Sequence, residues 1–389
     1  SSNSSTNYTL GNSETLAIAE NVTYSGTITI NGTSTQISNC GTFSGTLTYS
    51  SGDFDIINSG TWNTTQLLTI GNSSSLINCS NGTYTKTGIA NGIELTGTGT
   101  LDNDGTISLS TSGSTSKALK LNGSGTVTND GELTLYGTLD IPGSNTLTNN
   151  GTIDIYTDAG QNSGSGILNM GGASSQTLNN YGDIICHDDG SSNMAQTINN
   201  YGNMEFYNLG MSANIMYNDC KIKTRNNFTN SGYGSGAPLN TNYVGKFEIG
   251  GTSTNTAYFG IDAYQTTYTR IDFCDATSGN GGHFDTQVGY IGTSITYCTN
   301  SGSCPQYNSQ QSTPPSVSIN PSSSSICSGS SSTLTTTVTN GTTPYSYSWA
   351  ASSGSAPSGA SPSVTPTVTT TYTVTVTDNA SQTATATTA

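Results

Sequence analysis

Charged residues are scarce in this chain, and basic residues are the scarcest. The 389 residues include 8 Lys and Arg against 23 Asp and Glu, which gives a formal net charge of −15. Proteins that bind nucleic acid or an anionic membrane through charge carry the opposite balance, so neither partner is expected. No basic residue follows Arg270, and Asp378 is the only charged residue after Asp285. Trypsin therefore has no site in this last stretch, which suits exposure to extracellular proteases.

Long apolar runs and cofactor motifs are also missing. No run of about 20 apolar residues suggests a membrane span, so membrane insertion is not expected. No signal peptide precedes the opening Ser1-Ser2-Asn3-Ser4, which we expect to be a mature end from which a signal peptide has been removed. The eight Cys lack the C-x-x-C spacing of zinc sites, and no P-loop or Gly-x-Ser-x-Gly turn occurs. The sequence therefore predicts no metal, no cofactor and no enzymatic activity.

What the sequence does contain is one short phrase repeated nine times. The phrase is an apolar residue, a spacer, an Asn, one or a few residues and then Gly before a strand-like run, as in residues 147–153. Successive Asn marks lie 19, 20, 25, 26, 20, 31, 20 and 30 residues apart. A period near 20 with longer insertions is typical of the stacked coils of a solenoid. The marks are Asn39, Asn58, Asn78, Asn103, Asn129, Asn149, Asn180, Asn200 and Asn230.

The strand-like runs explain how such coils would stack. They alternate with period two, as in Thr152-Ile153-Asp154-Ile155, so one set of side chains would face a common interior. Asn and Gly tolerate positive φ, which makes each Asn-x-Gly a natural corner. Stacking would place the marking Asn residues about 4.8 Å apart, where their amides can bond in a ladder. Disorder is the alternative, but 21 Tyr and apolar residues in register with the corners favour an ordered all-β solenoid.

Four segments are predicted. Residues 1–38 form an N-terminal cap or first coils, and residues 39–301 form the β-solenoid, a parallel β-helix, with a C-terminal cap. Residues 302–315, rich in Pro and Ser, form a linker. Residues 316–389 contain short alternating runs around Trp349 and are predicted to form a small Ig-like β-sandwich.

The cysteines favour disulfides in an oxidising compartment. Cys40 and Cys79 occupy comparable corners two repeats apart, which is about 9.6 Å at the usual strand spacing. That exceeds the roughly 7 Å between Cα atoms that a disulfide allows, so a direct bond would require a shift of register. A second pair is a candidate for a bond between neighbouring coils, and a third pair either bridges the linker or reaches another subunit. These two pairs are Cys186 with Cys220 and Cys304 with Cys327.

Two stretches resemble known surface proteins. Residues 326–329, 333–335, 345–349 and 364–378 resemble the Ig-like (PKD-like) modules of Bacteroidota surface proteins. Those modules recur in adhesins and gliding-motility-associated proteins exported by the type IX secretion system. Residues 271–276 followed by 292–298 are similar to the ends of β-solenoids in the same proteins. The resemblance implies a disulfide between Cys274 and Cys298 that staples the cap. The chain departs from the pattern at Asn379-Ala380-Ser381, where such modules often carry a second Cys.

Two sets of side chains are candidates for binding. Tyr181 and Tyr201 follow the marking Asn in successive repeats, where they either form a strip for stacking sugars or pack on each other. Lys221, Lys223 and Arg225 cluster positive charge, and they either contact an acidic glycan or form a solvated coil edge.

These features predict a secreted, non-enzymatic structural or adhesive protein of the cell surface. It would be a subunit or segment of an extracellular fibre or adhesin, and it would associate with itself or with other surface proteins. The alternative is an extracellular β-helix protein that binds or degrades polysaccharide, although the chain has few basic residues for the pattern of a lyase.

Overall fold

The structure is a computed structural model of two compact units, Ser1–Gln306 and Tyr307–Ala389. The described elements are all β-strands. In the part of the chain that the structure describes, no helix is long and apolar enough to cross a lipid bilayer. The predicted linker, Cys304 and Cys327 lie outside the described residues. The described residues are 3–49, 53–112, 117–157, 166–171, 175–218, 220–231, 244–257, 259, 270–276, 281–288, 291, 295–298, 316–321, 328, 330–339, 345–377 and 383–388.

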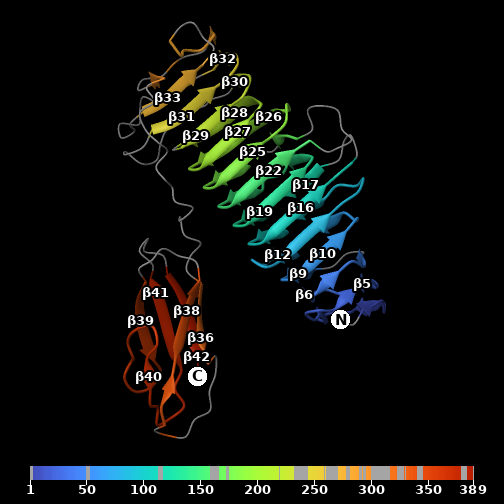
Figure 1. Ribbon diagram of the computed structural model, residues 1–389, viewed down its shortest axis with the longest axis vertical. Coiled ribbons are helices and arrows are strands. Elements are labelled where there is room, and N and C mark those ends of the chain that lie inside the picture. The colour runs from blue at the N-terminus through green and yellow to red at the C-terminus, as the bar shows by residue number, and fades with distance from the viewer. Residues whose placement is uncertain are drawn as a thin grey trace. The chain divides into compact units, whose positions relative to one another are not determined.

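The first unit is a parallel β-solenoid, as predicted (Figure 1). Each turn contributes up to three short strands, and each strand pairs in parallel with its equivalent in the next turn. One turn, for example, consists of β10 (Thr61–Thr64), β11 (Leu68–Ile70) and β12 (Ser75–Asn78). We call the three resulting rows of strands the first, second and third face.

The first face is a 14-stranded sheet. In spatial order its strands are β1 (Asn3–Ser4), β4 (Thr23–Tyr24), β7 (Thr42–Phe43), β10, β13 (Thr83–Lys86), β16 (Thr106–Ser110), β19 (Glu132–Tyr136), β22 (Thr152–Tyr156), β25 (Asp183–Cys186), β27 (Asn203–Phe206), β29 (Lys221–Thr224), β31 (Val244–Ile249), β33 (Arg270–Asp275) and β35 (Ile295–Tyr297).

The other two faces merge towards the C-terminal end of the unit, because β26 (Ser191–Asn200) and β28 (Asn208–Asn218) extend across both, with a register shift between Gln196 and Thr197. The second face also contains β2 (Tyr8–Leu10), β5 (Thr27–Ile30), β8 (Thr46–Tyr49), β11, β14 (Ile93–Gly97), β17 (Lys117–Gly123), β20 (Thr138–Ile141), β23 (Leu168–Met170), β30 (Phe228–Asn230), β32 (Ser253–Asn255) and β34 (Thr286–Gln287). The third face also contains β3 (Thr15–Ile18), β6 (Thr35–Asn39), β9 (Phe54–Asn58), β12, β15 (Thr100–Asn103), β18 (Thr126–Asn129), β21 (Thr146–Asn149) and β24 (Thr177–Asn180).

The alternation in the sequence decides which side chains enter the solenoid. In β16, for example, Ile107 and Leu109 are buried, while Thr106 and Ser108 face outward. The buried apolar side chains of all turns form one continuous core from Leu10 to Phe284. Each turn thus covers the apolar face of its neighbour, and no turn could bury its own core alone.

The predicted asparagine ladder lies inside the corner between the third and first faces. Each side-chain Nδ2 donates to the Oδ1 of the next Asn at 2.7–2.8 Å. Each also donates to a backbone carbonyl, as Asn103 does to Glu132 at 3.1 Å. These side chains are at most 1% exposed. The ladder consists of Asn39, Asn58, Asn78, Asn103, Asn129, Asn149, Asn180, Asn200 and Asn218.

The ninth predicted ladder position, Asn230, is wrong. Asn218 takes that place and accepts a bond from Asn200 at 2.8 Å, while Asn230 belongs to a second, shorter ladder. Its Nδ2 donates to Asn255 at 2.8 Å, and Asn255 donates to Gln287 at 3.3 Å. Asn218 does not match the sequence pattern, because Cys220 replaces the expected Gly in its repeat.

The corner glycines are required by close packing rather than by positive φ. Gly105, Gly151 and Gly202 are not among the residues with positive φ. A Cβ at Gly151 would lie 2.1 Å from the carbonyl oxygen of Gly131 in the preceding turn, and the other corners are similarly tight. Where Cys220 replaces the glycine, the bond from the Lys221 N–H to the Gly202 carbonyl lengthens to 3.3 Å, from 3.0 Å at the preceding corner.

The two ends of the solenoid are built differently. At the N-terminal end, β1, β2 and β3 are members of the three faces, so this segment forms first coils. At the C-terminal end the core is filled by aromatic rings, with Phe273 and Phe284 stacked at 4.0 Å between centroids. A disulfide joins Cys274 and Cys298 there, as the family resemblance implied.

The second unit contains small antiparallel sheets. Strand β36 (Ser316–Asn320) pairs with β38 (Thr335–Thr339), and β37 (Ser332–Thr333) pairs with β40 (Ser363–Val364). Strand β41 (Tyr372–Thr377) lies between β39 (Ser346–Ala351) and β42 (Thr383–Thr388). Their core is formed by Ile319, Leu334, Trp349, Val364, Tyr372, Val374 and Val376.

The ladder predicts a difference between interior and terminal positions. Asn103→Ala should destabilise the solenoid by about 2 kcal/mol or more, because it leaves the buried Oδ1 of Asn129 without its donor. Asn218→Ala should cost less, because its Nδ2 donates to the backbone carbonyl of Lys246, so no ladder side chain loses a donor. Urea unfolding followed by circular dichroism measures both. Equal losses at the two positions would contradict the ladder's directional role.

Candidate functional site

One column of outward side chains runs along the corner outside the ladder. Its members follow the ladder Asn directly. The backbone N–H of each donates to the carbonyl of the ladder Asn in the preceding turn, or of Ile18 in the case of Cys40, so neighbouring members lie one turn apart. Their chemistry changes along the axis from thiol and hydroxyl to carboxylate, amide and phenol. The column consists of Cys40, Ser59, Cys79, Asp104, Asp130, Asn150, Tyr181 and Tyr201.

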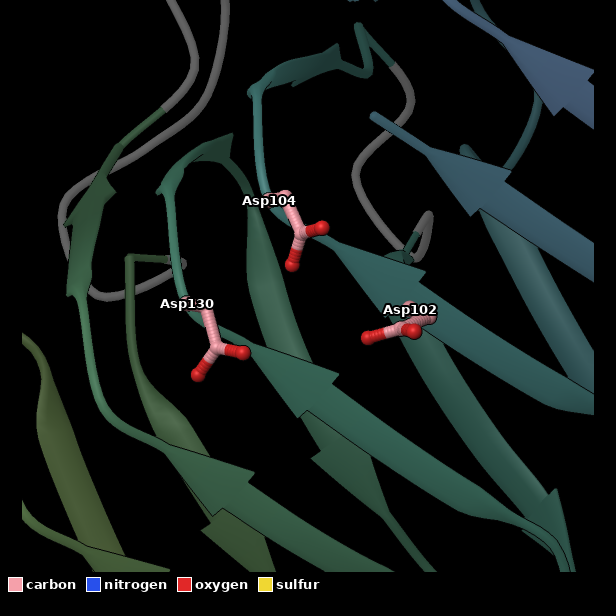
Figure 2. Close-up of side chains that lie close together, drawn as sticks. All are labelled: Asp102, Asp104 and Asp130. Atoms are coloured by element: carbon pink, nitrogen blue, oxygen red, sulfur yellow. The ribbon is translucent and has the colours of Figure 1, made fainter. Parts of the chain in front are cut away.

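Carboxylates gather in the middle of this column. Asp104 and Asp130 come from neighbouring turns, and Asp102 comes from β15, the strand that leads into Asp104 (Figure 2). One oxygen from each of the three lies within 4.8 Å of the others. These residues were not predicted as a site, because Asp102 and Asp104 fall in a different repeat from Asp130. Their proximity arises only from the pairing of Asp102 with Thr128 and of Asn103 with Asn129.

The environment of two of these carboxylates, Asp102 and Asp104, opposes their ionisation. Burial is the main cause that raises the pKa of Asp102 and Asp104 above the ordinary value. The negative charges of Asp104 and Asp130 raise the pKa of Asp102 further, and Asp130 does the same for Asp104. Calcium takes six to eight oxygen ligands, so three carboxylates supply an incomplete set. The cluster acts in this structure as a point of local charge repulsion.

The tyrosines of the column pack on each other. The rings of Tyr181 and Tyr201 are stacked, with centroids 4.9 Å apart and planes 7° apart. Each ring therefore uses one face on its neighbour. This arrangement supports the packing interpretation over a platform for sugars, which would need free ring faces.

A second aromatic column lies on the first face. Tyr136 stacks on Tyr156 at 5.3 Å, and Tyr156 stacks on His187 at 4.2 Å with parallel rings. His187 Nε2 lies 2.6 Å from Asp154 Oδ1, which fixes the ring in the column. Tyr136, at the N-terminal end, is 37% exposed. Residues 136, 156 and 187 are 20 and 31 residues apart, the same intervals as those between Asn129, Asn149 and Asn180 of the ladder. Aligning the repeats on the ladder would therefore have predicted this column.

The side chains of the predicted basic cluster pair with two glutamates. Lys223 and Arg225 lie 3.1 and 3.5 Å from Glu205, and Lys221 lies 2.7 Å from Glu248. A second lysine, Lys246, also pairs with Glu248, at 2.9 Å. Burial alone would raise the pKa of Glu248, but hydrogen bonds from the two lysines lower it. The pairs are partly exposed, so each contributes little stability, and the cluster fits the interpretation as a solvated coil edge.

Lys86 is a buried cation that the sequence analysis missed. It is the first basic residue of the chain and is fully buried. Its ammonium group donates to the carbonyl oxygens of Gly88, Ala90 and Ser110, which ties the loop after β13 to the next turn. The buried side chain thus links two neighbouring turns and does not lie at the surface as a solvated charge.

The cysteines divide into bonded and free ones. The predicted bond between Cys186 and Cys220 is wrong, because Cys186 is a free, buried thiol and Cys220 is bonded elsewhere. The two differ in position: Cys186 points inward at the end of β25, and Cys220 occupies a corner two turns later. Burial raises the pKa of Cys186 to about 11, so it remains protonated and inert. Cys40 and Cys79 are free, as their separation predicted.

The second unit contains a cavity of 360 Å³ lined by small polar residues and prolines, including Ser353, Pro366 and Thr370. Tyr372 is the one titratable side chain in its lining. Such a lining offers no pair of groups for acid–base catalysis.

No protein-family model matches the chain, and neither a curated protein nor a solved structure is significantly similar to it.

The acidic cluster predicts a pH-dependent gain of stability. A carboxyl with a raised folded pKa opposes folding above that pKa and ceases to oppose it when protonated. Asp104→Asn should therefore stabilise the solenoid at pH 7 by up to about 1 kcal/mol, the scale of partly exposed charge pairs. The gain should vanish at pH 3, below the ordinary Asp pKa of about 3.9. Urea unfolding at both pH values tests this, with Asp189→Asn at an exposed position as control. If Asp104→Asn lowers the free energy of unfolding at pH 7, charge repulsion among the three carboxylates is refuted.

Proposed function

We propose that the protein is a secreted, non-enzymatic component of a cell surface that works as a rigid structural or adhesive rod. The observation that carries this proposal is the amide ladder, which runs unbroken through nine turns and ties each to the next. A structure in which every turn is bonded to its neighbours resists bending and local opening. Proteolysis requires such opening, so this rod suits an extracellular setting.

The arrangement of reactive groups supports a structural role. Both histidines and the buried lysine have partners within the solenoid: His187 pairs with Asp154, His283 stacks on Tyr297 at 3.6 Å, and Lys86 donates to backbone carbonyls. The carboxylates that converge, at residues 102, 104 and 130, lie on an outward corner rather than in a cleft. An enzyme would require a nucleophile or an acid–base pair held beside a substrate site.

The second unit serves, in this proposal, as an Ig-like (PKD-like) module that spaces the rod from the cell or contacts the next subunit. Its support is the antiparallel pairing around one small core in which Trp349 donates from Nε1 to the Gly359 carbonyl at 2.9 Å. The motifs in residues 326–378 also resemble such modules of Bacteroidota proteins exported by the type IX secretion system. The unit's lack of basic residues allows subunits to meet there with little charge repulsion.

A glycan-binding rod is the second candidate. Its support is the exposed Tyr136 at the head of the aromatic column, beside outward carboxylate and hydroxyl groups on the same face. An exposed aromatic ring flanked by polar groups is a common contact for sugars. The stacking of the remaining rings weakens this candidate.

Assembly into fibres is tested by electron microscopy of the full chain over a range of concentrations. The 14-stranded first face predicts a rod of about 60 Å for one solenoid at the usual strand spacing. We expect filaments many times that length at high concentration. Monodisperse particles of a single rod length at every concentration would contradict polymerisation.

The glycan alternative is tested by incubating the protein with plant, algal and bacterial polysaccharides. Pull-down with insoluble polymers and assays for reducing ends or unsaturated products should be negative if the role is structural. Binding that is lost in Tyr136→Ala and kept in Tyr181→Ala would instead support the glycan-binding rod.

A further inference from the structure

Two free thiols share the corner column in the first turns. Cys40 is exposed and Cys79 is partly exposed. Ser59 lies between them, because the N–H of Ser59 donates to the Asn39 carbonyl and that of Cys79 to the Asn58 carbonyl. They are therefore two strand spacings apart, about 9.6 Å, which is too far for a bond within one chain. By contrast, Cys220, Cys274 and Cys298 are oxidised in the same unit.

The surface beside these thiols carries two apolar side chains and few charges. Ile57 and Ile77 are adjacent in register on the third face and point outward, where most equivalent positions carry Thr, Ser, Asn or Asp. Between Glu20 and Lys86 the charged residues are Asp53 and Asp55 alone. A partner can therefore approach this ridge with little electrostatic cost and cover two β-branched side chains.

We infer that this ridge, formed by residues 40, 57, 59, 77 and 79, is the contact surface for a second copy of the chain, joined by two reciprocal disulfides. When two solenoids lie antiparallel with their ridges facing, a two-fold axis beside Ser59 relates them. Cys40 then faces Cys79 of the second copy, and Cys79 faces its Cys40. The same operation places Ile57 against its counterpart, while Ile77 faces Ser38 of the second copy and lies one strand spacing from that copy's Ile57. Both bonds form in one register because the spacing of the thiols is the same in each copy, which is the self-complementarity that two-fold interfaces require.

The chemistry needs an oxidant, for which a small disulfide such as oxidised glutathione is sufficient. The thiolate of Cys40 attacks the glutathione disulfide, releases one reduced glutathione and forms a mixed disulfide. The thiolate of Cys79 in the second copy then attacks the protein sulfur of that mixed disulfide, and the second glutathione leaves as thiolate and is protonated. Each protein disulfide thus consumes two thiols and one oxidised glutathione and yields two reduced glutathione molecules. The dimer does not depend on the proposed function, because a rod with any role would carry the same ridge.

The test uses the full chain oxidised with glutathione, followed by non-reducing electrophoresis and light scattering. A covalent dimer that reductant converts to monomer is expected. An endoproteinase that cuts before Asp53 and Asp55 separates Cys40 from Cys79, which trypsin cannot do because Lys86 is the first basic residue. Mass spectrometry of a mixture of ¹⁵N-labelled and unlabelled chains should show Cys40 linked to Cys79 in label-mixed pairs.

Single substitutions distinguish disulfides formed in this register from disulfides formed by random oxidation. Cys40→Ser and Cys79→Ser should each abolish the dimer, because like thiols lie two turns, about 9.6 Å, apart in the antiparallel register, while Cys186→Ser should leave it intact. Ile77→Asp should slow dimer formation at least several-fold, and Ile185→Asp, at an outward position on the first face, should not. Circular dichroism checks that each variant folds. Monomers with both thiols still open to alkylation, or dimers that persist in the single variants through like-to-like bonds, would overturn the inference.

Discussion

The parallel hydrogen bonding between successive turns is the interaction on which the rest of the solenoid depends. It fixes the distance between equivalent residues at one strand spacing. Their side chains must therefore be able to pack or bond favourably at that distance. The ladder amides are suited to it, because each Nδ2 reaches the next Oδ1 at 2.7–2.8 Å while a carbonyl takes its second hydrogen. A buried amide chain that is fully bonded rigidifies a core, whereas a partly bonded one would cost stability.

Because the spacing is fixed, the chemistry of this protein is arranged in columns rather than in clefts. Like residues in neighbouring turns meet whether or not the meeting is favourable. Aromatic rings gain from it, as in the stack of Tyr181 on Tyr201, and opposite charges gain from it, as in the pairing of Lys221 with Glu248. Carboxylates lose by it, as at Asp104 and Asp130. Whether a side chain stabilises or destabilises the solenoid therefore depends on the equivalent residues one turn away.

Much of this architecture could be predicted from the sequence, because the repeat carries both period and register. Asn39 to Asn200 were placed correctly, since each copy keeps an apolar residue two positions before the Asn. Asn218 was missed because the prediction relied on Gly, which marks close backbone contact and is replaced by Cys220. Asp102, Lys86 and the Tyr136 column could not be predicted from single motifs, since their partners lie in other turns and insertions of variable length separate them. Bond partners of cysteines depend on the same alignment, which is why Cys186 was assigned wrongly.

The amide ladder also gives the solenoid a direction. Every bond in it points the same way, from the nitrogen of one turn to the oxygen of the next, so the chain of amide dipoles adds along the axis. At one extreme Asn39 ends the series with a buried oxygen that accepts no hydrogen bond, opposite Ile18 in the preceding turn. At the other, Asn218 gives its hydrogen to the main chain. The solenoid is thus electrically polar along the axis of its ladder, and two solenoids lying head to foot would cancel each other's field.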